Sequence, residues 1–334
     1  MDTLPVGVIG CGRMGRLHAR VYSQMPRVRL VGVFDASAES AAAVAELHQT
    51  TAFANLSSLL ENVQAVTVAV PTIHHLPIAR QCLGDGVACL IEKPLAKDAS
   101  EARQIVELAQ STGVTVQVGH IERFNPAVVA MNRLNIRPQF IEVTRISPMT
   151  FRSIDVGVVL DMMIHDIDIV LQLAGAAVER IDAVGVAVLG DVEDVCNARL
   201  NFANGCVANI TASRLALKTE RKLRVFSPDA YVSLDYQKRY AMVAHRGGNL
   251  EAIRDAVRRI RSGEIEDLSQ LNFAELVQVE ELQIDDVEPL RAELEAFVDT
   301  VVAGSSPAVS ARDGLAAVET AERIIGAMKA HTLK

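Results

Sequence analysis

The chain has 334 residues, of which half are hydrophobic, and it carries a formal net charge of −8. This length is enough for two packed domains and excludes a single small one. The acidic balance argues against a nucleic-acid or anionic-membrane surface, because both need a basic field.

The cysteine pattern and the lengths of the apolar runs indicate which covalent or metal sites to expect and where in the cell the protein lies. The cysteines are odd in number and have no C-x-x-C spacing. We therefore expect neither a disulfide framework nor a bound metal. The first residues lack a basic segment followed by an apolar core, and the chain has no run of about 18 apolar residues. This pattern predicts a cytoplasmic protein.

The beginning of the chain has the pattern of a strand, a glycine turn and a helix. An apolar run, Val6 to Ile9, leads into the turn, and a helical pattern follows from Leu17 to Met25. In such a turn the first glycine permits a tight bend, the second lets the backbone approach a pyrophosphate, and the third lets the helix pack on the strand. The turn therefore predicts a dinucleotide site formed by Gly10, Gly12, Arg13, Met14 and Gly15.

A second strand ends in a carboxylate that suits a ribose. The apolar run Leu30 to Phe34 is followed by Asp35, twenty residues after Gly15. A carboxylate at this distance accepts hydrogen bonds from the ribose diol. It would repel a 2′-phosphate, and Ala36 and Ser37 supply no arginine to receive one. The sequence therefore predicts NAD rather than NADP.

Helices and strands then alternate. The predicted helices span 38–47, 78–83 and 100–113, and the predicted strands span 65–70, 88–91 and 114–118. This alternation predicts a parallel, doubly wound sheet with ligand groups at the carboxyl ends of its strands. Two such ends carry candidate cofactor-binding residues, which are Val70, Pro71, Thr72, His75, Glu92 and Lys93. The alternative to cofactor binding is that Lys93 is solvated and paired with Glu92.

The segment from Asp155 to Leu171 is apolar almost all round, which predicts a buried helix. Asp161, His165 and Asp168 occur at i, i+4 and i+7 and therefore share one face. An aspartate one turn before a histidine can orient the imidazole and leave the other ring nitrogen for proton transfer. The alternative is a core histidine satisfied by a neighbouring carboxylate.

Together these motifs resemble the glucose–fructose oxidoreductase and inositol dehydrogenase (Gfo/Idh/MocA) family of nicotinamide-dependent sugar oxidoreductases. The resemblance covers essentially the whole chain. It rests on the glycine turn followed by His18, Pro71-Thr72 with His75, Glu92-Lys93-Pro94, and Asp161 with His165. It implies that Lys93 and His165 are catalytic, with Asp161 beside them. It also implies an α+β domain whose open, mostly antiparallel sheet serves for oligomerisation, and hence a homodimer or homotetramer.

A narrower similarity concerns the substrate. The segment Gly119 to Pro126, with Ser147-Pro148, Arg152 and Val159 to Asp168, is similar to the branch that oxidises UDP-linked N-acetylglucosamine sugars at the 3-hydroxyl. A guanidinium suits phosphate oxygens. The expected substrate-binding residues are therefore Lys93, Arg123, Asn125, Arg152, Asp161 and His165. The alternative is that Arg123 pairs with Glu122 or another acidic residue and acts as an interdomain strut.

Beyond Pro126 the predicted strands follow one another without intervening helices, at 140–146, 178–189, 195–202, 206–213, 222–226 and 231–236. This order predicts a mostly antiparallel sheet with the 155–174 helix on one face. Since only 294–302 and 315–328 remain as clear helices, we expect a partner subunit on the other face. The predicted domains are an NAD-binding Rossmann domain, 1–122, and an α+β substrate-binding and oligomerisation domain, 123–334.

The expected activity is NAD-dependent oxidation of a sugar secondary alcohol to a ketone. His165 is the expected general base, and Lys93 is expected to donate a hydrogen bond to the same oxygen. The two roles would be exchanged if desolvation favoured a neutral Lys93. Two other functions stay open, which are a dehydrogenase of a free polyol or sugar such as myo-inositol, and a catalytically silent, dinucleotide-sensing regulator.

Overall fold

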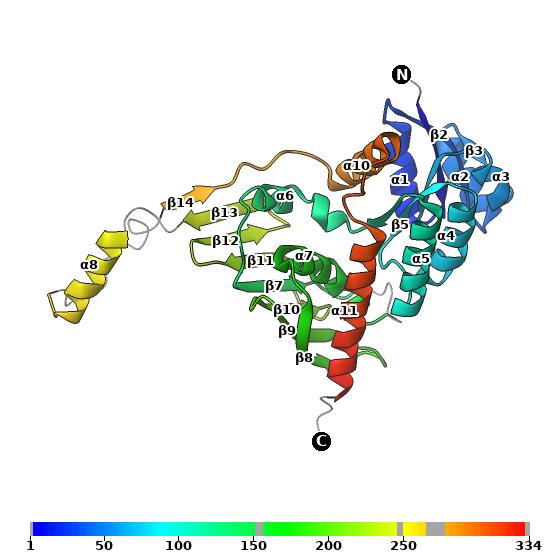
Figure 1. The fold of residues 1–334 in the computed structure, drawn as a ribbon. Coiled ribbons are helices and arrows are strands. Elements are labelled where there is room, and N and C mark those ends of the chain that lie inside the picture. Colours follow the sequence, from blue (N-terminus) through cyan, green and yellow to red (C-terminus); the bar gives the residue numbers. More distant parts are fainter. Residues whose placement is uncertain (1–2, 151–155, 246–249, 265–277, 331–334) are drawn as a thin grey trace. The chain divides into compact units, whose positions relative to one another are not determined.

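The computed structural model describes residues 3–150, 156–245, 250–264 and 278–330, which form two compact units (Figure 1). The first unit comprises Met1–Phe124, Val159–Ile169 and Val287–Ala330, and the second comprises Asn125–Val158 and Val170–Asp286. The domain ranges 1–122 and 123–334 stay a prediction. The compact units differ from those ranges because residues 159–169 and 287–330 pack with the amino-terminal segment.

The first unit is built on six parallel strands in the order β3-β2-β1-β4-β5-β6. This finding confirms the predicted doubly wound sheet, whose strand order reverses between β1 and β4. Strands β1, β4, β5 and β6 are mostly apolar and buried, as expected for a sheet covered on both faces, whereas β2 is partly exposed and the edge strand β3 is exposed. They are β1 (Leu4–Ile9), β2 (Val28–Phe34), β3 (Thr51–Ala52), β4 (Ala65–Val68), β5 (Ala88–Glu92) and β6 (Val116–Gly119).

The register of this sheet places the functional segments side by side. Ile9, the last residue of β1, pairs with Phe34 of β2 and with Val68 of β4. Glu92 of β5 pairs with Gly119 of β6. The glycine turn, Asp35 and the residues that follow β4, β5 and β6 therefore emerge at one edge of the sheet.

Helices cover this sheet, and side-chain caps fix several of their first residues. Ser37, Asn55 and Asp98 each accept a hydrogen bond from the backbone N–H three residues later. The helices are α1 (Arg13–Ser23), α2 (Ala38–Leu47), α3 (Leu56–Leu60), α4 (His75–Gly84), α5 (Ala99–Thr112), α10 (Pro289–Ala303) and α11 (Ala311–Ala330), with short 3-10 turns η1 (Thr72–His74) and η2 (Ile121–Phe124).

The carboxyl-terminal helices complete the first unit. The N–H of Val118 in β6 donates to the carbonyl of Val309, just before α11. A Cβ at Gly314 would lie 2.8 Å from a methyl group of Val118 and 3.1 Å from Leu95. A glycine is therefore required where α11 packs against β6. This contact joins residues that are far apart in the sequence.

The second unit contains an eight-stranded sheet in the order β14-β13-β12-β11-β7-β10-β9-β8. Neighbouring strands are antiparallel except β7 and β10, which confirms the mostly antiparallel prediction. The strands are β7 (Phe140–Ile146), β8 (Val178–Val186), β9 (Val195–Phe202), β10 (Val207–Ser213), β11 (Glu220–Phe226), β12 (Ala230–Asp235), β13 (Tyr240–His245) and β14 (Gln278–Glu281), with helices α6 (Pro126–Asn132) and α8 (Leu250–Arg261).

The segment predicted as one helix over 155–174 differs from a regular α-helix. Residues Val159–Met163 form a π-helix, η3, and α7 (Ile164–Ala174) continues from it. The hydrogen bonds of a π-helix run from i to i+5, and such turns occur often at functional sites. The α-helical spacing assumed for Asp161 and His165 is therefore wrong across this turn. Residues 151–155 lie outside the described ranges.

A buried ion pair holds the residues that lead into η3. The Arg214 guanidinium donates from Nε to Asp194 Oδ1 (2.6 Å) and from Nη1 to the Val156 carbonyl (2.8 Å). Burial opposes the ionisation of Asp194, but the N–H groups of Leu189 and Val188 and the Arg214 guanidinium together keep the pKa of Asp194 below its usual value.

Strand β8 is shorter than the predicted strand 178–189, because it ends at Val186.

Candidate active site

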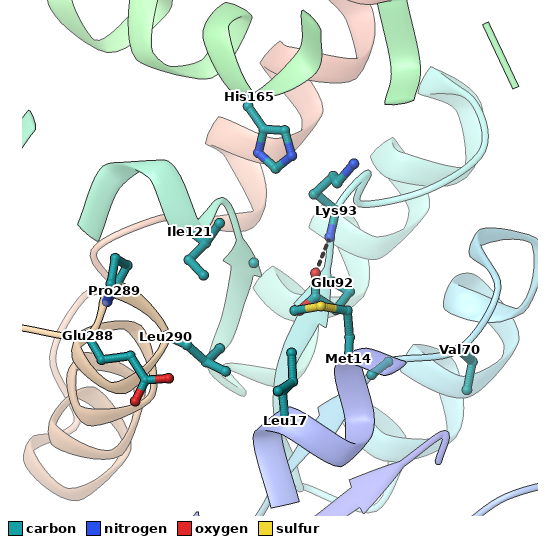
Figure 2. Close-up of a pocket in the computed structure, with 12 residues that line it drawn as sticks. Met14, Leu17, Val70, Glu92, Lys93, Ile121, His165, Glu288, Pro289 and Leu290 are labelled. Atoms are coloured by element: carbon teal, nitrogen blue, oxygen red, sulfur yellow. Dashed lines mark hydrogen bonds between the residues drawn. The ribbon is translucent and has the colours of Figure 1, made fainter. Parts of the chain in front are cut away.

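A cavity of about 500 Å³ lies at the carboxyl edge of the first unit's sheet (Figure 2). Its wall is mostly apolar and comes from α1, α7, α10 and the ends of β4, β5 and β6. Four groups that can carry charge, Glu92, Lys93, His165 and Glu288, line this cavity, a composition typical of ligand sites. The lining residues are Met14, Leu17, Ala69, Val70, Glu92, Lys93, Gly119, Ile121, His165, Glu288, Pro289 and Leu290.

The glycine turn has the form that a pyrophosphate needs. Gly10 has a φ of +95°, and a Cβ there would lie 2.4 Å from the Ala69 carbonyl oxygen. A Cβ at Gly15 would lie 1.7 Å from the Gly10 oxygen, whereas a Cβ at Gly12 would meet nothing within 4 Å. Internal packing therefore requires two of the glycines, and the space beside Gly12 is open. The first turn of α1 has no side-chain cap, so its N–H groups suit an anion.

Asp35 is held against this turn. Its Oδ2 accepts a hydrogen bond from the Cys11 N–H (2.6 Å), and its Oδ1 accepts one from the Ser37 N–H (2.8 Å). Each carboxylate oxygen keeps a second lone pair for a ribose hydroxyl. Burial and the charge of Asp35 raise the pKa of the Cys11 thiol to about 11, so this thiol stays neutral. The geometry fits the adenosine end of a dinucleotide.

Lys93 is attached to the π-helix. Its ammonium donates a hydrogen bond to the Asp161 carbonyl oxygen (2.7 Å) and lies 4.0 Å from Asp161 Oδ1. The His165 imidazole is directed towards the same part of the cavity (Figure 2). The structure therefore brings together Lys93, Asp161 and His165 from two distant segments. The interaction it records for Asp161 is with Lys93, and an orienting contact from Asp161 to His165 stays a prediction.

His75 supports the strand ends. Its Nδ1 lies 3.0 Å from the Pro94 carbonyl oxygen, and its Nε2 lies 3.0 Å from that of Val70. Burial lowers the pKa of His75. The imidazole thus joins the end of β4 to the turn that carries Lys93. Direct contact of His75, Pro71 or Thr72 with a cofactor stays a prediction.

Arg123 and Asn125, predicted to bind substrate, have partners within the chain. The Arg123 guanidinium forms two hydrogen bonds with the Asp168 carboxylate (2.7 and 2.6 Å) and lies 3.6 Å from Asp313. The Asn125 side chain caps α6 by accepting the Ala127 N–H (3.1 Å). Arg152 lies outside the described residues. The substrate role of these residues stays a prediction, and the geometry favours a structural role for Arg123.

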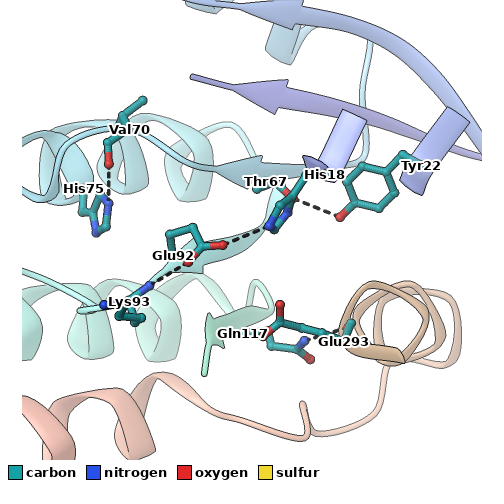
Figure 3. Close-up of polar contacts among 9 residues, drawn as sticks. All are labelled: His18, Tyr22, Thr67, Val70, His75, Glu92, Lys93, Gln117 and Glu293. Carbon is teal, nitrogen blue, oxygen red and sulfur yellow. Dashed lines mark hydrogen bonds and ion pairs between the residues drawn. The ribbon is translucent and has the colours of Figure 1, made fainter. Parts of the chain in front are cut away.

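A buried chain of hydrogen bonds behind Glu92 was not predicted from the sequence (Figure 3). His18 Nε2 lies 2.9 Å from Glu92 Oε1, His18 Nδ1 lies 3.2 Å from Thr67 Oγ1, and the Tyr22 hydroxyl lies 3.0 Å from Thr67 Oγ1. Burial opposes the ionisation of Glu92, but His18 and Lys93 keep the pKa of Glu92 below its usual value. A signal was present in the sequence, since Thr67 interrupts an otherwise apolar strand and His18 lies in the helix after the glycine turn.

Comparisons with known proteins show which family the chain belongs to. Residues 4–120 match the model of an oxidoreductase family with an NAD-binding Rossmann fold, and residues 141–232 match the Gfo/Idh/MocA C-terminal domain. The chain belongs to the Gfo/Idh/MocA family of oxidoreductases. Its cofactor is NAD, and its expected chemistry is that of a sugar dehydrogenase.

Individual relatives are similar over most of their length. A UDP-N-acetylglucosamine 3-dehydrogenase of Acidithiobacillus ferrooxidans is 38% identical over 80% of this chain and 88% of its own. Its solved structure has a TM-score of 0.87 over 99% of both chains at 32% identity. An inositol 2-dehydrogenase of Rhizobium meliloti is 25% identical over 97% of this chain and 96% of its own. A levoglucosan dehydrogenase in complex with NADH and levoglucosan shares the fold, with a TM-score of 0.83 at 20% identity and coverage of 99% and 98%.

Asp35 is expected to set the preference for NAD. The Asp35→Ala variant should narrow the difference between the NAD and NADP dissociation constants, because the carboxylate that repels a 2′-phosphate is removed. Calorimetric titration of both cofactors measures this. Glu107→Ala, which removes an exposed carboxylate from α5, should leave the difference unchanged. Equal affinity of the unmodified protein for NAD and NADP would contradict the assignment.

Arg123 is expected to act as a strut inside the first unit. The Arg123→Ala variant should lose about 3–5 kcal/mol of unfolding free energy, because it leaves the Asp168 carboxylate buried and unpaired. Denaturant unfolding measures the loss. Arg27→Ala breaks an exposed pair with Asp299 and should cost under about 1 kcal/mol. An unchanged stability with a raised KM for a UDP-sugar would instead identify Arg123 as a substrate contact.

Proposed function

We propose that this protein oxidises the 3-hydroxyl of UDP-N-acetylglucosamine, or of a closely related UDP-sugar, to a ketone with NAD. The observation that carries the proposal is the convergence of Lys93 and His165 on one cavity beside an open glycine turn. The 38% identity to a UDP-N-acetylglucosamine 3-dehydrogenase supports the choice of substrate. The inositol dehydrogenase that aligns over nearly the whole chain is less similar, at 25% identity.

The residues present divide the reaction between them. Bound NAD would supply the hydride acceptor for the carbon that carries the hydroxyl. His165 takes the hydroxyl proton as general base. Lys93 donates a hydrogen bond to the same oxygen and stabilises its developing negative charge. The Asp161 carbonyl oxygen accepts one hydrogen bond from the Lys93 ammonium, which has three N–H donors.

The environment of Lys93 supports this division of roles. A carbonyl oxygen at 2.7 Å and a carboxylate oxygen at 4.0 Å both favour the ammonium over the neutral amine. A lysine held as a cation is a hydrogen-bond donor and no proton acceptor. The proton therefore goes to His165. A regulator that only senses the dinucleotide has no need for this arrangement, which favours an enzyme.

The second unit offers a surface for self-association. Strand β8 is an edge of the eight-stranded sheet, and Val184 and Val186 on it are 41% and 49% exposed. Exposed apolar residues in such a row suit a second copy of the chain. We expect a homodimer or homotetramer formed through this sheet.

Among the described residues no helix is long and apolar enough to cross a bilayer. The cytoplasmic location stays a prediction.

The activity itself is tested with purified protein, NAD and UDP-N-acetylglucosamine. NADH should form when a coupled step consumes the 3-keto product, because alcohol oxidation by NAD is unfavourable near neutral pH. Free N-acetylglucosamine and myo-inositol are the matched controls and should give little NADH. Turnover of myo-inositol alone would assign the enzyme to the polyol dehydrogenases. Cofactor binding without turnover of any sugar would favour the regulator.

Lys93 and His165 are expected to act as one catalytic unit. Lys93→Ala and His165→Ala should each lower kcat by about a hundred- to ten-thousand-fold while NAD still binds. The double variant should be little slower than either single variant, since residues that share a transition state are not additive. Lys97→Ala, which removes a half-exposed lysine paired with Glu101, is the control and should retain activity. Additive losses would show that the two residues act in separate steps.

A further inference from the structure

The last residues before η3 are held by two hydrogen bonds within the second unit. Arg214 Nη1 donates to the Val156 carbonyl oxygen (2.8 Å), and the Val158 N–H donates to the Glu193 carbonyl oxygen (2.9 Å). These four residues belong to the second unit, whereas η3, which begins at the next residue of the chain, belongs to the first. The point at which the chain enters η3 is therefore fixed to the second unit.

The ion pair behind one of these bonds is itself firmly held. Asp194 directly precedes β9 and Arg214 directly follows β10, and the Arg214 N–H donates to the Asp194 carbonyl oxygen (3.0 Å). The Asp194 carboxylate also accepts the N–H groups of Val188 (2.7 Å) and Leu189 (2.8 Å). A guanidinium is planar and its donors form a fixed fork, so its bonds to Asp194 and to Val156 fix the distance between these two residues. We call this ion pair and the backbone that it holds the η3 anchor.

A second buried ion pair holds the helix that follows η3. The Arg123 guanidinium forms two hydrogen bonds with Asp168 of α7 (2.7 and 2.6 Å), and the two side chains are 10% and 1% exposed. The stretch from Val158 to Asp168 is therefore fixed at both ends. Between these ends the chain forms the wider turn of a π-helix. This turn places the Asp161 carbonyl oxygen 2.7 Å from Lys93 Nζ.

Little slack separates the anchor from the reactive groups. Asp161 is the third residue after Val158, and three residues span at most about 11 Å even when fully extended. Hydrogen bonds between N–H and oxygen leave their usual range beyond about 3.2 Å. A shift of about 1 Å at the start of η3 is therefore enough to weaken the bond between Lys93 and the Asp161 carbonyl. A misplacement of that size costs up to about a hundredfold in rate.

We infer that Asp194 and Arg214 are positioning residues for the oxidation, because they determine where η3 presents the Asp161 carbonyl to Lys93 and how His165 enters the cavity. The inference rests on the proposed function, in which Lys93 and His165 act on the substrate hydroxyl. Neither residue of the ion pair lines the cavity, so both act through η3. The glycine turn and Asp35 lie on other segments, and NAD binding is therefore independent of the anchor.

The test compares kcat and the NAD dissociation constant of the unmodified protein and the Arg214→Lys variant. Lysine keeps a cation beside Asp194 but replaces the fork of the guanidinium by a compact ammonium. At temperatures well below melting, kcat should fall about ten- to a hundredfold, while the NAD dissociation constant stays unchanged. The deuterium isotope effect on kcat should be at least as large as in the unmodified protein with UDP-N-acetylglucosamine deuterated at C3, because hydride transfer itself is slowed.

Arg180→Lys is the matched control, since it makes the same change in an exposed pair with Asp182 on β8 of the same sheet. It should leave kcat unchanged. A folded Arg214→Lys variant with a lower melting temperature and an unchanged kcat would show a purely structural role. That result would overturn the inference and leave the proposed function intact.

Crystal structures separate the inference from the proposed function, because they need no substrate. In Arg214→Lys the distance from Lys93 Nζ to the Asp161 carbonyl oxygen should exceed hydrogen-bonding range. The same distance in both proteins would overturn the inference. A lengthened distance in a protein that does not oxidise UDP-N-acetylglucosamine would instead support the anchor and overturn the proposed substrate.

Hydrogen exchange of the unmodified protein tests the anchor without any variant. The Val158 N–H should exchange as slowly as the Arg214 N–H, which donates to the Asp194 carbonyl at the end of the sheet. Exchange of the Val158 N–H at the rate of an exposed loop amide would mean that this segment is not held. It would overturn the inference even if the Arg214 variant failed to fold.

Discussion

The hydrogen bond from the Lys93 ammonium to the Asp161 carbonyl connects the Rossmann sheet to the π-helix η3. Lys93 follows the last residue of β5, so its position depends on the sheet, while the carbonyl depends on the wider turn of η3. Their contact determines where the proposed donor and the proposed base, His165, stand relative to each other. Proton transfer requires a separation near 3 Å between donor and acceptor atoms, so the geometry of this one bond constrains the chemistry.

Two further polar contacts support the segments that form this hydrogen bond. His75 joins the carbonyl of Val70 to that of Pro94 and so fixes the turn that carries Lys93. Arg123 holds Asp168 of α7, one turn beyond His165, with two hydrogen bonds. Each contact joins residues separated in sequence, and each satisfies charges or carbonyls that burial would otherwise penalise. The same interactions that stabilise the first unit therefore also position its reactive side chains.

The sequence predicted the parts of this structure that local patterns determine. The glycine turn, Asp35 and apolar strands were sufficient for the parallel sheet, because each depends on residues near in sequence. The π-helix was not predictable, since an apolar run such as Val158 to Met163 does not distinguish hydrogen bonds to i+4 from those to i+5. The packing of α11 against β6 and the partner of Arg123 depend on contacts between distant segments, which periodicity does not record. His18 was recognised only as part of a motif.

Two buried carboxyl groups near the cavity show how the surroundings of a side chain decide its charge. Glu92 receives hydrogen bonds from His18 and from the Lys93 N–H, and its pKa is lowered. Glu293 of α10 has no hydrogen-bond donor for either oxygen among the described residues, and burial and the charge of Glu92 raise its pKa. Two carboxylates in one apolar region cannot both ionise at low cost, so the donors select which one does. Because the hydrogen-bond donors that the structure describes lie beside Glu92, the negative charge is held at the wall of the cavity and not in the core behind it.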